Sequence, residues 1–322
     1  MTETIVVLDP ITEQTAERLR ALLPPGMTLT HAAARDEAHL RSIIAEADYA
    51  ISGQIGVPGA VLRAATRLKL LHKWGVGVDN FDLDAARALG ITVARTTGSN
   101  AVPVAEFTLG LMIAVLRNLA HGHAELSEGR WIGGNFARQT MMLSGKTVGL
   151  VGFGAIGKTV ARLLSGFGCT ILYHKPRPAD PAEAAALGAR HAPLPELLAQ
   201  SDVVSLHCPL TSETAGLIDR AALSAMKPTA VLINVARGGV VVEPDLIWAL
   251  QNRVIHAAAM DVFETEPLPP DSPLLKLDGL TVTPHMAAIA ADNFEKTVRQ
   301  MFGNIERHSR GETVPERDVV VA

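Results

Sequence analysis

Apolar and polar positions in the first third of the chain alternate in blocks that predict helices and strands in turn. Helices are predicted where apolar residues recur with a period of 3.6, at residues 13–23, 37–47, 60–65 and 82–89. Short apolar runs beside them predict strands at residues 5–9, 27–31, 49–52, 68–74 and 91–94. This alternation is typical of a parallel sheet that is covered by helices on both faces.

A long helical pattern follows at residues 102–126. Pro103 falls in its first turn, where proline is tolerated, and no other proline interrupts the pattern. Apolar residues occupy much of its circumference, so we predict one continuous, buried helix. A loop at residues 129–143, which contains Trp131, separates this helix from the second half of the chain.

A second alternating series begins at Lys146. Its strands are predicted at residues 147–153, 170–174, 203–208, 230–236, 256–262 and 280–285. Six strands fit the two mononucleotide-binding halves of a Rossmann domain. An amphipathic helix is predicted at residues 293–310, and because it follows the last strand we expect it to return to the first domain. The sequence of the tail, residues 311–322, places few constraints on its structure.

The glycine pattern Gly152-x-Gly154-x-x-Gly157 lies between the strand at 147–153 and an amphipathic helix. A helix N-terminus presents unpaired N–H groups and a positive dipole end, which together bind phosphate. A strand before the glycines and a helix after them make the match specific, so the sequence predicts a dinucleotide site here. The similar Gly75-x-Gly77 lacks the third glycine and is interpreted as a loop with N–H groups facing a cleft.

Composition excludes several classes of function. The net charge of −4 argues against sequence-independent electrostatic binding of nucleic acid or anionic lipid. The longest apolar stretch, residues 107–116, is too short to span a membrane, and the N-terminus lacks the pattern of a secretory signal, so we expect a cytoplasmic protein. Two cysteines form no disulfide framework, and the eleven histidines are scattered. The pair His121-x-His123 is interpreted as solvated helix surface, and no metal is expected.

Three polar stretches follow successive predicted strands, at the edge where open α/β sheets bind ligands. They supply Arg237, the carboxylates of residues 261–266, and His285. Arginine holds a carboxylate through two parallel hydrogen bonds. Histidine is suited to proton transfer near neutral pH, and a carboxylate on its other ring nitrogen would fix its tautomer.

The chain resembles the D-isomer-specific 2-hydroxyacid dehydrogenase family over essentially its full length. The matching motifs, in family order, are KWGVGVDNFDLDAA, SNAVPVAEFTLGLM, VGFGAIG, LHCPLT, INVARGGVV, DVFETEP and TPH. The resemblance implies two doubly wound α/β domains: a flavodoxin-like substrate-binding domain (1–99 and 288–322) and a Rossmann dinucleotide-binding domain (100–287). It also implies hydride transfer between NAD(P)H and a 2-oxo or 2-hydroxy acid, and a homodimer with the long helix and the Trp131 loop as candidate contacts.

By that resemblance Arg237 orients the substrate, His285 is the acid/base, and Glu266, the glutamate immediately before proline, pairs with His285; Glu264 is not carried over. The backbone around Val76 and Gly77 would clamp the substrate carboxylate, with Gly53 as a further contact. The cofactor-binding residues would be Val104, Gly152, Gly154, Ala155, Ile156, Gly157, His174, Lys175, Arg177, Cys208, Pro209, Thr214, Val235, Ala236 and Asp261, the last bonding the nicotinamide amide.

Cofactor preference is predicted from the end of the second Rossmann strand, where NAD-specific sites place an acidic residue. The sequence there reads Tyr173-His-Lys-Pro-Arg177 and contains no acid. Lys175 and Arg177 could pair with a 2′-phosphate, which favours NADP over NAD. If these basic side chains merely point into water, the preference does not follow.

At two positions this sequence differs from branches of the family with a known substrate type, and both differences narrow the choice of substrate. In the phosphoglycerate-oxidising branch a basic residue of a first-domain loop serves the phosphate, but residues 51–55 read ISGQI. A small acid of the glyoxylate or hydroxypyruvate type is therefore favoured, with 3-phosphoglycerate as the alternative. Glu266 counts against formate oxidation, where the histidine's partner is typically an amide. A dinucleotide-sensing corepressor, which shares this fold and triad, is the alternative from another functional class.

Overall fold

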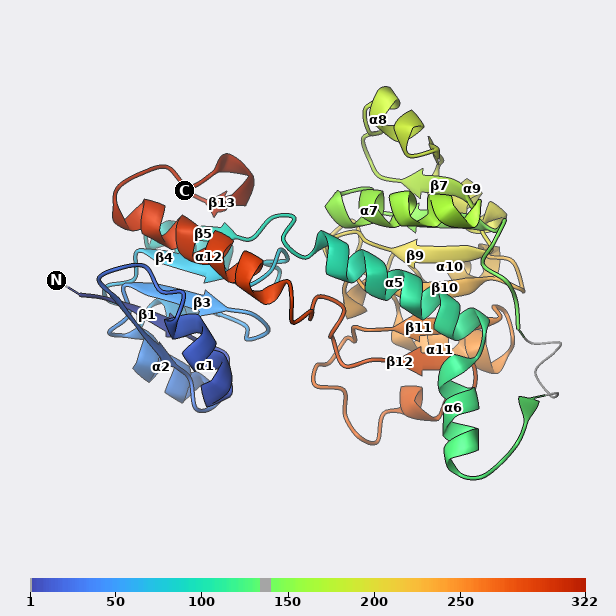
Figure 1. Cartoon of the computed structure of the whole chain (residues 1–322), viewed down its shortest axis with the longest axis horizontal. Coiled ribbons are helices and arrows are strands. Elements are labelled where there is room, and N and C mark those ends of the chain that lie inside the picture. The colour runs from blue at the N-terminus through green and yellow to red at the C-terminus, as the bar shows by residue number, and fades with distance from the viewer. Residues whose placement is uncertain (1, 134–139) are drawn as a thin grey trace. The chain divides into compact units, whose positions relative to one another are not determined.

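A computed structural model describes residues 2–133 and 140–322. The chain divides into two compact units. Unit 1 consists of Met1–Asn100 and Ala290–Ala322, and unit 2 of Ala101–Ile289. Figure 1 labels most of the helices and strands of both units.

Unit 1 is built on a six-stranded sheet with the order β13-β5-β4-β3-β1-β2. All neighbouring strands are parallel except β13, which runs antiparallel to β5. The strands are β1 (Glu3–Val7), β2 (Met27–His31), β3 (Tyr49–Ser52), β4 (Leu70–Lys73), β5 (Thr92–Arg95) and β13 (Val319–Val321).

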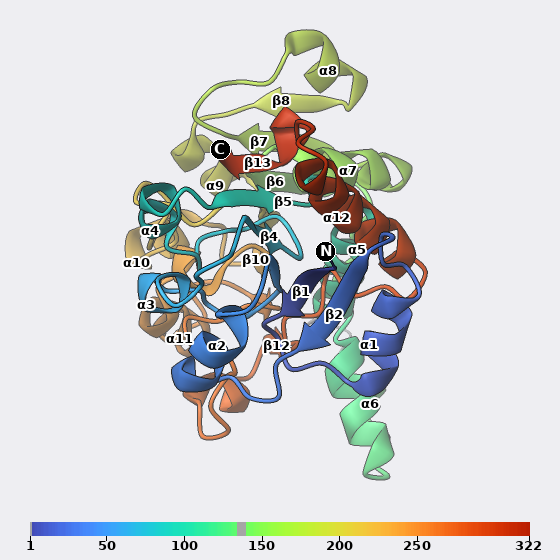
Figure 2. The ribbon, with the colours of Figure 1, turned by 90° about the vertical axis from the view of Figure 1, so that its left-hand side faces the viewer.

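Helices cover both faces of this sheet (Figure 2). Apolar residues of α2 (Glu37–Ile44), α3 (Gly59–Leu62) and α4 (Leu83–Ala88) pack in one core cluster with one face of the sheet. The opposite face packs against α1 (Glu13–Arg20) and α12 (Phe294–Ser309). The helix after the last Rossmann strand thus belongs to the core of unit 1.

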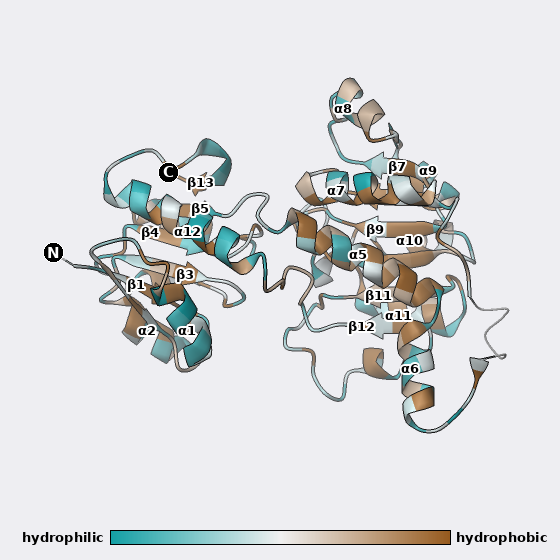
Figure 3. Ribbon diagram, viewed as in Figure 1, coloured by the Kyte–Doolittle hydropathy of each residue, from teal (hydrophilic) through white to brown (hydrophobic). Residues whose placement is uncertain are grey.

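Unit 2 contains a seven-stranded, wholly parallel sheet with the order β12-β11-β10-β9-β6-β7-β8. The strands are β6 (Thr147–Val151), β7 (Thr170–His174), β8 (Ala189–His191), β9 (Val203–Leu206), β10 (Val231–Asn234), β11 (Ala257–Met260) and β12 (Leu280–Val282). The central strands are largely apolar (Figure 3), as expected for strands that are buried on both faces.

Two core clusters hold the helices of unit 2 against its sheet. One contains α5 (Ala101–Leu116), α7 (Ala155–Leu164) and α8 (Pro181–Ala186). The other contains α9 (Leu194–Gln200), α10 (Arg220–Ala225) and α11 (Glu243–Gln251). Both units are doubly wound α/β sheets, which confirms the predicted fold class.

The structure corrects the sequence prediction in three elements. The helix predicted at 102–126 is two helices, α5 and α6 (Leu119–Ser127), bent by 64°. The break lies at Asn118, whose φ of 53° is left-handed, and asparagine tolerates that conformation better than most residues. The strand β8 was not predicted because Ala-Arg-His carries no apolar run. The tail also forms a strand, β13, which completes the edge beside β5.

No single helix in the described ranges is long and apolar enough to cross a membrane, although α5 and α6 together satisfy such a test of length and composition as a bent pair.

Candidate active site

Three neighbouring strands of unit 2 place the predicted catalytic residues at one edge of the sheet. Strands β10, β11 and β12 are parallel and adjacent. Arg237 follows β10, Glu266 lies in the segment after β11, and His285 follows β12. Because the carboxyl ends of parallel strands meet at the same edge, residues distant in sequence come together here.

His285 and Glu266 are in direct contact. Nδ1 of His285 donates a hydrogen bond to Oε2 of Glu266 over 2.6 Å. A carboxylate only accepts, so this bond places the hydrogen of the neutral imidazole on Nδ1. The other ring nitrogen, Nε2, is then able to accept a proton from a substrate hydroxyl. Their side chains are 34% and 31% exposed, so the pair is accessible.

Glu266 is stabilised in its charged form. Burial disfavours the carboxylate, but the hydrogen bond from His285, the bond from the Phe263 N–H and the charge of Arg237 together lower its pKa. The Phe263 N–H binds Oε1 over 2.9 Å, opposite to the oxygen that His285 binds. Both carboxylate oxygens are therefore fixed, and the imidazole is held in one orientation.

The turn that carries His285 is organised by Asp261. Oδ1 of Asp261 accepts from the Thr283 hydroxyl at 2.6 Å and from the Met286 N–H at 3.0 Å, and Oδ2 accepts from the Ala287 N–H at 2.9 Å. His285 itself has a left-handed φ of 49°, and its N–H donates to the Asp261 carbonyl. Asp261 is 1% exposed. Its role toward the nicotinamide amide stays a prediction, whereas its role in shaping this turn is direct.

Arg237 is positioned by the main chain around it. The Asn234 side chain, at the end of β10, donates to the Arg237 carbonyl at 2.9 Å and accepts from the Ala236 N–H at 3.0 Å. At Gly238 a Cβ atom would lie 1.9 Å from the carbonyl carbon of Phe263, so only glycine fits. This close approach brings the Arg237 turn against the segment that leads to Glu266.

The glycine loop has the form of a phosphate cradle. At Gly157 a Cβ atom would lie 2.4 Å from the Gly152 carbonyl oxygen, which requires glycine for helix and strand to pack. At Gly154, the N-cap of α7, a Cβ atom would meet no described residue within 4 Å, and no side chain in the described ranges caps the helix. No described residue accepts a main-chain hydrogen bond from the N–H groups of Ala155 and Ile156 in the first turn, so both are available to a pyrophosphate.

The end of β7 carries the predicted phosphate-selecting residues. Lys175 is half-buried and Arg177 is exposed, and within the described ranges neither forms an ion pair with a carboxylate. His174 Nδ1 lies 3.1 Å from the Ala192 carbonyl oxygen, and Nε2 of His191 lies 3.2 Å from the Lys175 carbonyl oxygen. These bonds fix the main chain at the strand end and leave both cations available to a ligand.

Among the other predicted cofactor residues, four lie in the core of unit 2. Their exposed fractions are 4%, 9%, 9% and 8% for Val104, Cys208, Val235 and Ala236. Burial raises the pKa of the Cys208 thiol to about 11, so this cysteine is not a reactive thiolate near neutral pH. Pro209 is exposed, and the Thr214 hydroxyl donates to its carbonyl over 2.6 Å.

The predicted substrate contacts lie in unit 1, after β3 and β4. Gly53 uses both of its main-chain polar groups within the unit, bonding Asp9 and Lys73. In the loop after β4, Gly75 bonds Thr96, whereas no described residue accepts a hydrogen bond from the N–H groups of Val76 or Gly77. The latter two N–H groups are thus the ones available to a carboxylate.

The family model described as "D-isomer specific 2-hydroxyacid dehydrogenase, NAD binding domain" matches residues 109–287. A glyoxylate reductase from Korarchaeum cryptofilum is 38% identical over 264 residues, which cover 80% of this chain and 78% of that protein. The chain belongs to the D-isomer-specific 2-hydroxyacid dehydrogenase family. The motif-based assignment of this family is confirmed.

Two further relatives show how much of each known protein this chain covers. The D-3-phosphoglycerate dehydrogenase of Mycobacterium tuberculosis is 39% identical over 282 residues, covering 87% of this chain but 53% of that protein. The chain thus spans about half the length of these phosphoglycerate dehydrogenases. The crystal structure of the TT0316 protein from Thermus thermophilus superposes with a TM-score of 0.87 at 33% identity, covering 99% of this chain and 100% of that one.

Sequence reasoning missed the residues that hold the candidate site in place. Asn234, the Phe263 N–H and Thr283 each bond a predicted site residue or its turn. A signal for Asn234 was present, because an amide at the end of a buried strand needs partners. The Phe263 N–H carries no side-chain signal and could be found only from the fold.

Proposed function

We propose that the protein is an NAD(P)-dependent D-2-hydroxyacid dehydrogenase that interconverts a small 2-oxo acid and its 2-hydroxy acid. The observation that carries this proposal is the 2.6 Å hydrogen bond between His285 and Glu266, beside the Arg237 turn. Unit 2 would bind the dinucleotide and unit 1 would supply the substrate loops. The Korarchaeum and Mycobacterium relatives described above are named as enzymes, which favours this function over a dinucleotide-sensing corepressor.

Each site residue has a distinct task in this reaction. The Arg237 guanidinium would bind the substrate carboxylate and polarise the carbonyl at C2, because a planar cation with several donors suits two acceptor oxygens. His285 would donate a proton to the carbonyl oxygen during reduction and accept it from the hydroxyl during oxidation. Glu266 would stabilise the imidazolium form. A bound nicotinamide supplies the hydride that C2 receives.

The dinucleotide would be held by the cradle at Gly152, Gly154 and Gly157, with its pyrophosphate against the first turn of α7. We propose NADP as the preferred form, because Lys175 and Arg177 lie at the strand end where an adenosine 2′-phosphate would be recognised and no carboxylate among the described residues neutralises them. The name of the matched domain supports a nicotinamide cofactor in general.

The substrate we favour is glyoxylate or hydroxypyruvate. The loop at residues 51–55 contains no basic side chain to hold a substrate phosphate. The name of the Korarchaeum relative agrees with a glyoxylate-type substrate. The names of the mycobacterial relatives keep 3-phosphoglycerate as the alternative.

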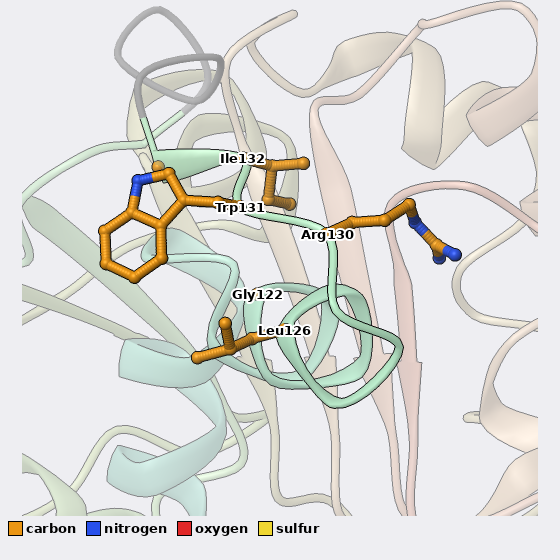
Figure 4. A pocket seen from close by; sticks show the side chains of 6 residues that line it. Gly122, Leu126, Arg130, Trp131 and Ile132 are labelled. Carbon is orange, nitrogen blue, oxygen red and sulfur yellow. The ribbon is translucent and has the colours of Figure 1, made fainter.

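A homodimer is proposed from an exposed apolar surface of unit 2. Trp131 is 87% exposed, and Leu119 and Leu126 of α6 are 54% and 56% exposed. Figure 4 shows a pocket on this surface, whose lining includes Trp131, Leu126 and Ile132. Large exposed apolar side chains are typical of association surfaces. A Trp131→Glu variant that stays as dimeric as the unmodified protein in light scattering would count against this surface.

The proposed activity is tested by an initial-rate matrix. NADPH and NADH are each paired with glyoxylate, hydroxypyruvate, pyruvate, 3-phosphohydroxypyruvate and bulkier 2-oxo acids. We expect turnover with the small acids and a higher kcat/KM with NADPH. Oxidation of neither cofactor with any acid would reject the dehydrogenase, and a higher kcat/KM with NADH would reject the NADP preference alone.

A further inference from the structure

The loop after β3 is held by a carboxylate from the neighbouring strand end. Asp9 follows β1 and accepts hydrogen bonds from three successive N–H groups, at distances of 2.5 Å from Gly53, 2.8 Å from Gln54 and 3.1 Å from Ile55. Successive N–H groups that converge in this way form a site for an anion. The chain itself supplies the anion here.

The carbonyl groups of the same three residues are also engaged. Nζ of Lys73 donates to the Gly53 carbonyl, and the Asn80 amide donates to those of Gln54 and Ile55 at 3.2 Å and 3.0 Å. Lys73 is 5% exposed and also donates to Oδ1 of Asn80 at 2.9 Å. Asp9 and Lys73 therefore hold the loop from its N–H side and its carbonyl side.

This arrangement determines what the loop can offer a ligand. All main-chain polar groups of residues 53–55 are used inside unit 1, so none is available to an incoming phosphate or carboxylate. The Gln54 side chain is exposed, and within the described part of the chain its amide makes no hydrogen bond. A neutral amide can both donate to and accept from a hydroxyl group, but it cannot balance a charge.

We propose that Asp9 is a positioning residue that presents Gln54 to the substrate, and that the loop selects 2-oxo acids with an uncharged hydroxyl on the third carbon. This inference rests on the proposed function, because it assigns the substrate loop of that same reaction. The inference goes beyond the lack of an arginine in residues 51–55. The main-chain N–H groups of this loop could have bound a phosphate in place of an arginine, but Asp9 already accepts hydrogen bonds from them.

The role of Asp9 is tested with Asp9→Ala and the milder Asp9→Asn. Removing the carboxylate frees the three N–H groups, so amide hydrogen exchange at residues 53–55 should accelerate at least about tenfold. The KM for hydroxypyruvate should rise about tenfold, while kcat and the Kd for NADPH stay within about twofold. Asp36→Ala is the matched control, because Asp36 caps α2 of the same unit at 2.9 Å. It should lower the denaturation midpoint without changing KM.

Gln54→Leu tests the substrate class. The kcat/KM for hydroxypyruvate should fall about tenfold, as for the loss of one hydrogen bond, and that for glyoxylate, which lacks the hydroxyl, should change less than about twofold. An equal change for both acids would overturn the role of Gln54. An unchanged KM and unchanged exchange in both Asp9 variants would overturn the role of Asp9. A protein that turns over no 2-oxo acid at all would instead reject the proposed function and this assignment with it.

Discussion

Glu266 lies 2.6 Å from Nδ1 of His285 and is held on its other oxygen by the Phe263 N–H. The carboxylate is thus a fixed support for the imidazole, and its lowered pKa keeps it charged. An imidazole that is held in this way presents Nε2 to the substrate in one tautomer. The proposed reaction requires this orientation of the imidazole both in reduction, when His285 donates a proton, and in oxidation, when it accepts one.

Glu266→Gln should leave the fold intact but lower kcat by about 10²-fold or more, because the amide no longer stabilises the imidazolium. The Kd for NADPH should be unchanged, since the Glu266 carboxylate bonds His285 and the Phe263 N–H rather than the glycine loop. Steady-state kinetics and fluorescence titration measure the two quantities. Glu264→Gln is the matched control and should retain kcat within about twofold.

Arg237→Gln should raise the KM for 2-oxo acids and lower kcat/KM by about 10²-fold or more, because a charge-assisted pair with the substrate carboxylate is lost. The side chain is anchored at 2.8 Å from the Ala236 carbonyl, so the turn itself should persist. Initial rates over a range of substrate concentrations decide this. Unchanged KM and kcat would remove Arg237 from the site.

Gly154→Ala should fold normally and bind the dinucleotide poorly. A Cβ atom at Gly154 meets no described residue within 4 Å, so the methyl group of alanine would occupy space proposed for the pyrophosphate. Gly166→Ala, which is also open, is the control and should bind NADPH as the unmodified protein does. Titration of NADPH fluorescence and thermal denaturation measure the two effects. Equal affinity in both variants would contradict the assignment of the cradle.

Replacing both Lys175 and Arg177 by Ser should lower the ratio of kcat/KM with NADPH to that with NADH by at least about tenfold. The reason is that both cations lack carboxylate partners among the described residues and would pair with the 2′-phosphate. Arg190→Ser removes a cation that is already paired with Glu196 and should leave the ratio unchanged. A ratio that does not respond to the double substitution would show that these cations only face water.

His72 makes stability depend on pH. Burial lowers its pKa to about 4 from an ordinary value of 6.5. Between these values the unfolded chain binds the additional proton and the folded chain does not, so the free energy of unfolding should fall as the pH is lowered from 6.5 to 4. The loss from this one group is about 3 kcal/mol. Urea denaturation at both pH values measures it, and His72→Asn should reduce the dependence whereas His123→Asn should not.

Most strands were predicted because they depend on local patterns, whereas the catalytic roles of Arg237, Glu266 and His285 stay a prediction. Buried parallel strands are apolar runs, and Arg237, Glu266 and His285 lie in distinctive motifs. The break at Asn118 was missed because its neighbours keep the helical period through a single left-handed residue. The Asp9 contacts were missed because they join residues more than forty positions apart, and only the strand order β3-β1 brings them together.

Isotope transfer tests the central claim most directly. NADPH labelled with deuterium at C4, prepared separately with the label on each face, is incubated with glyoxylate, and the glycolate is analysed by mass spectrometry. Direct hydride transfer predicts that one of the two labelled forms places one deuterium on C2 of glycolate, and that His285→Gln lowers the rate of its appearance about 10²-fold or more. Unlabelled glycolate from both forms would contradict the account.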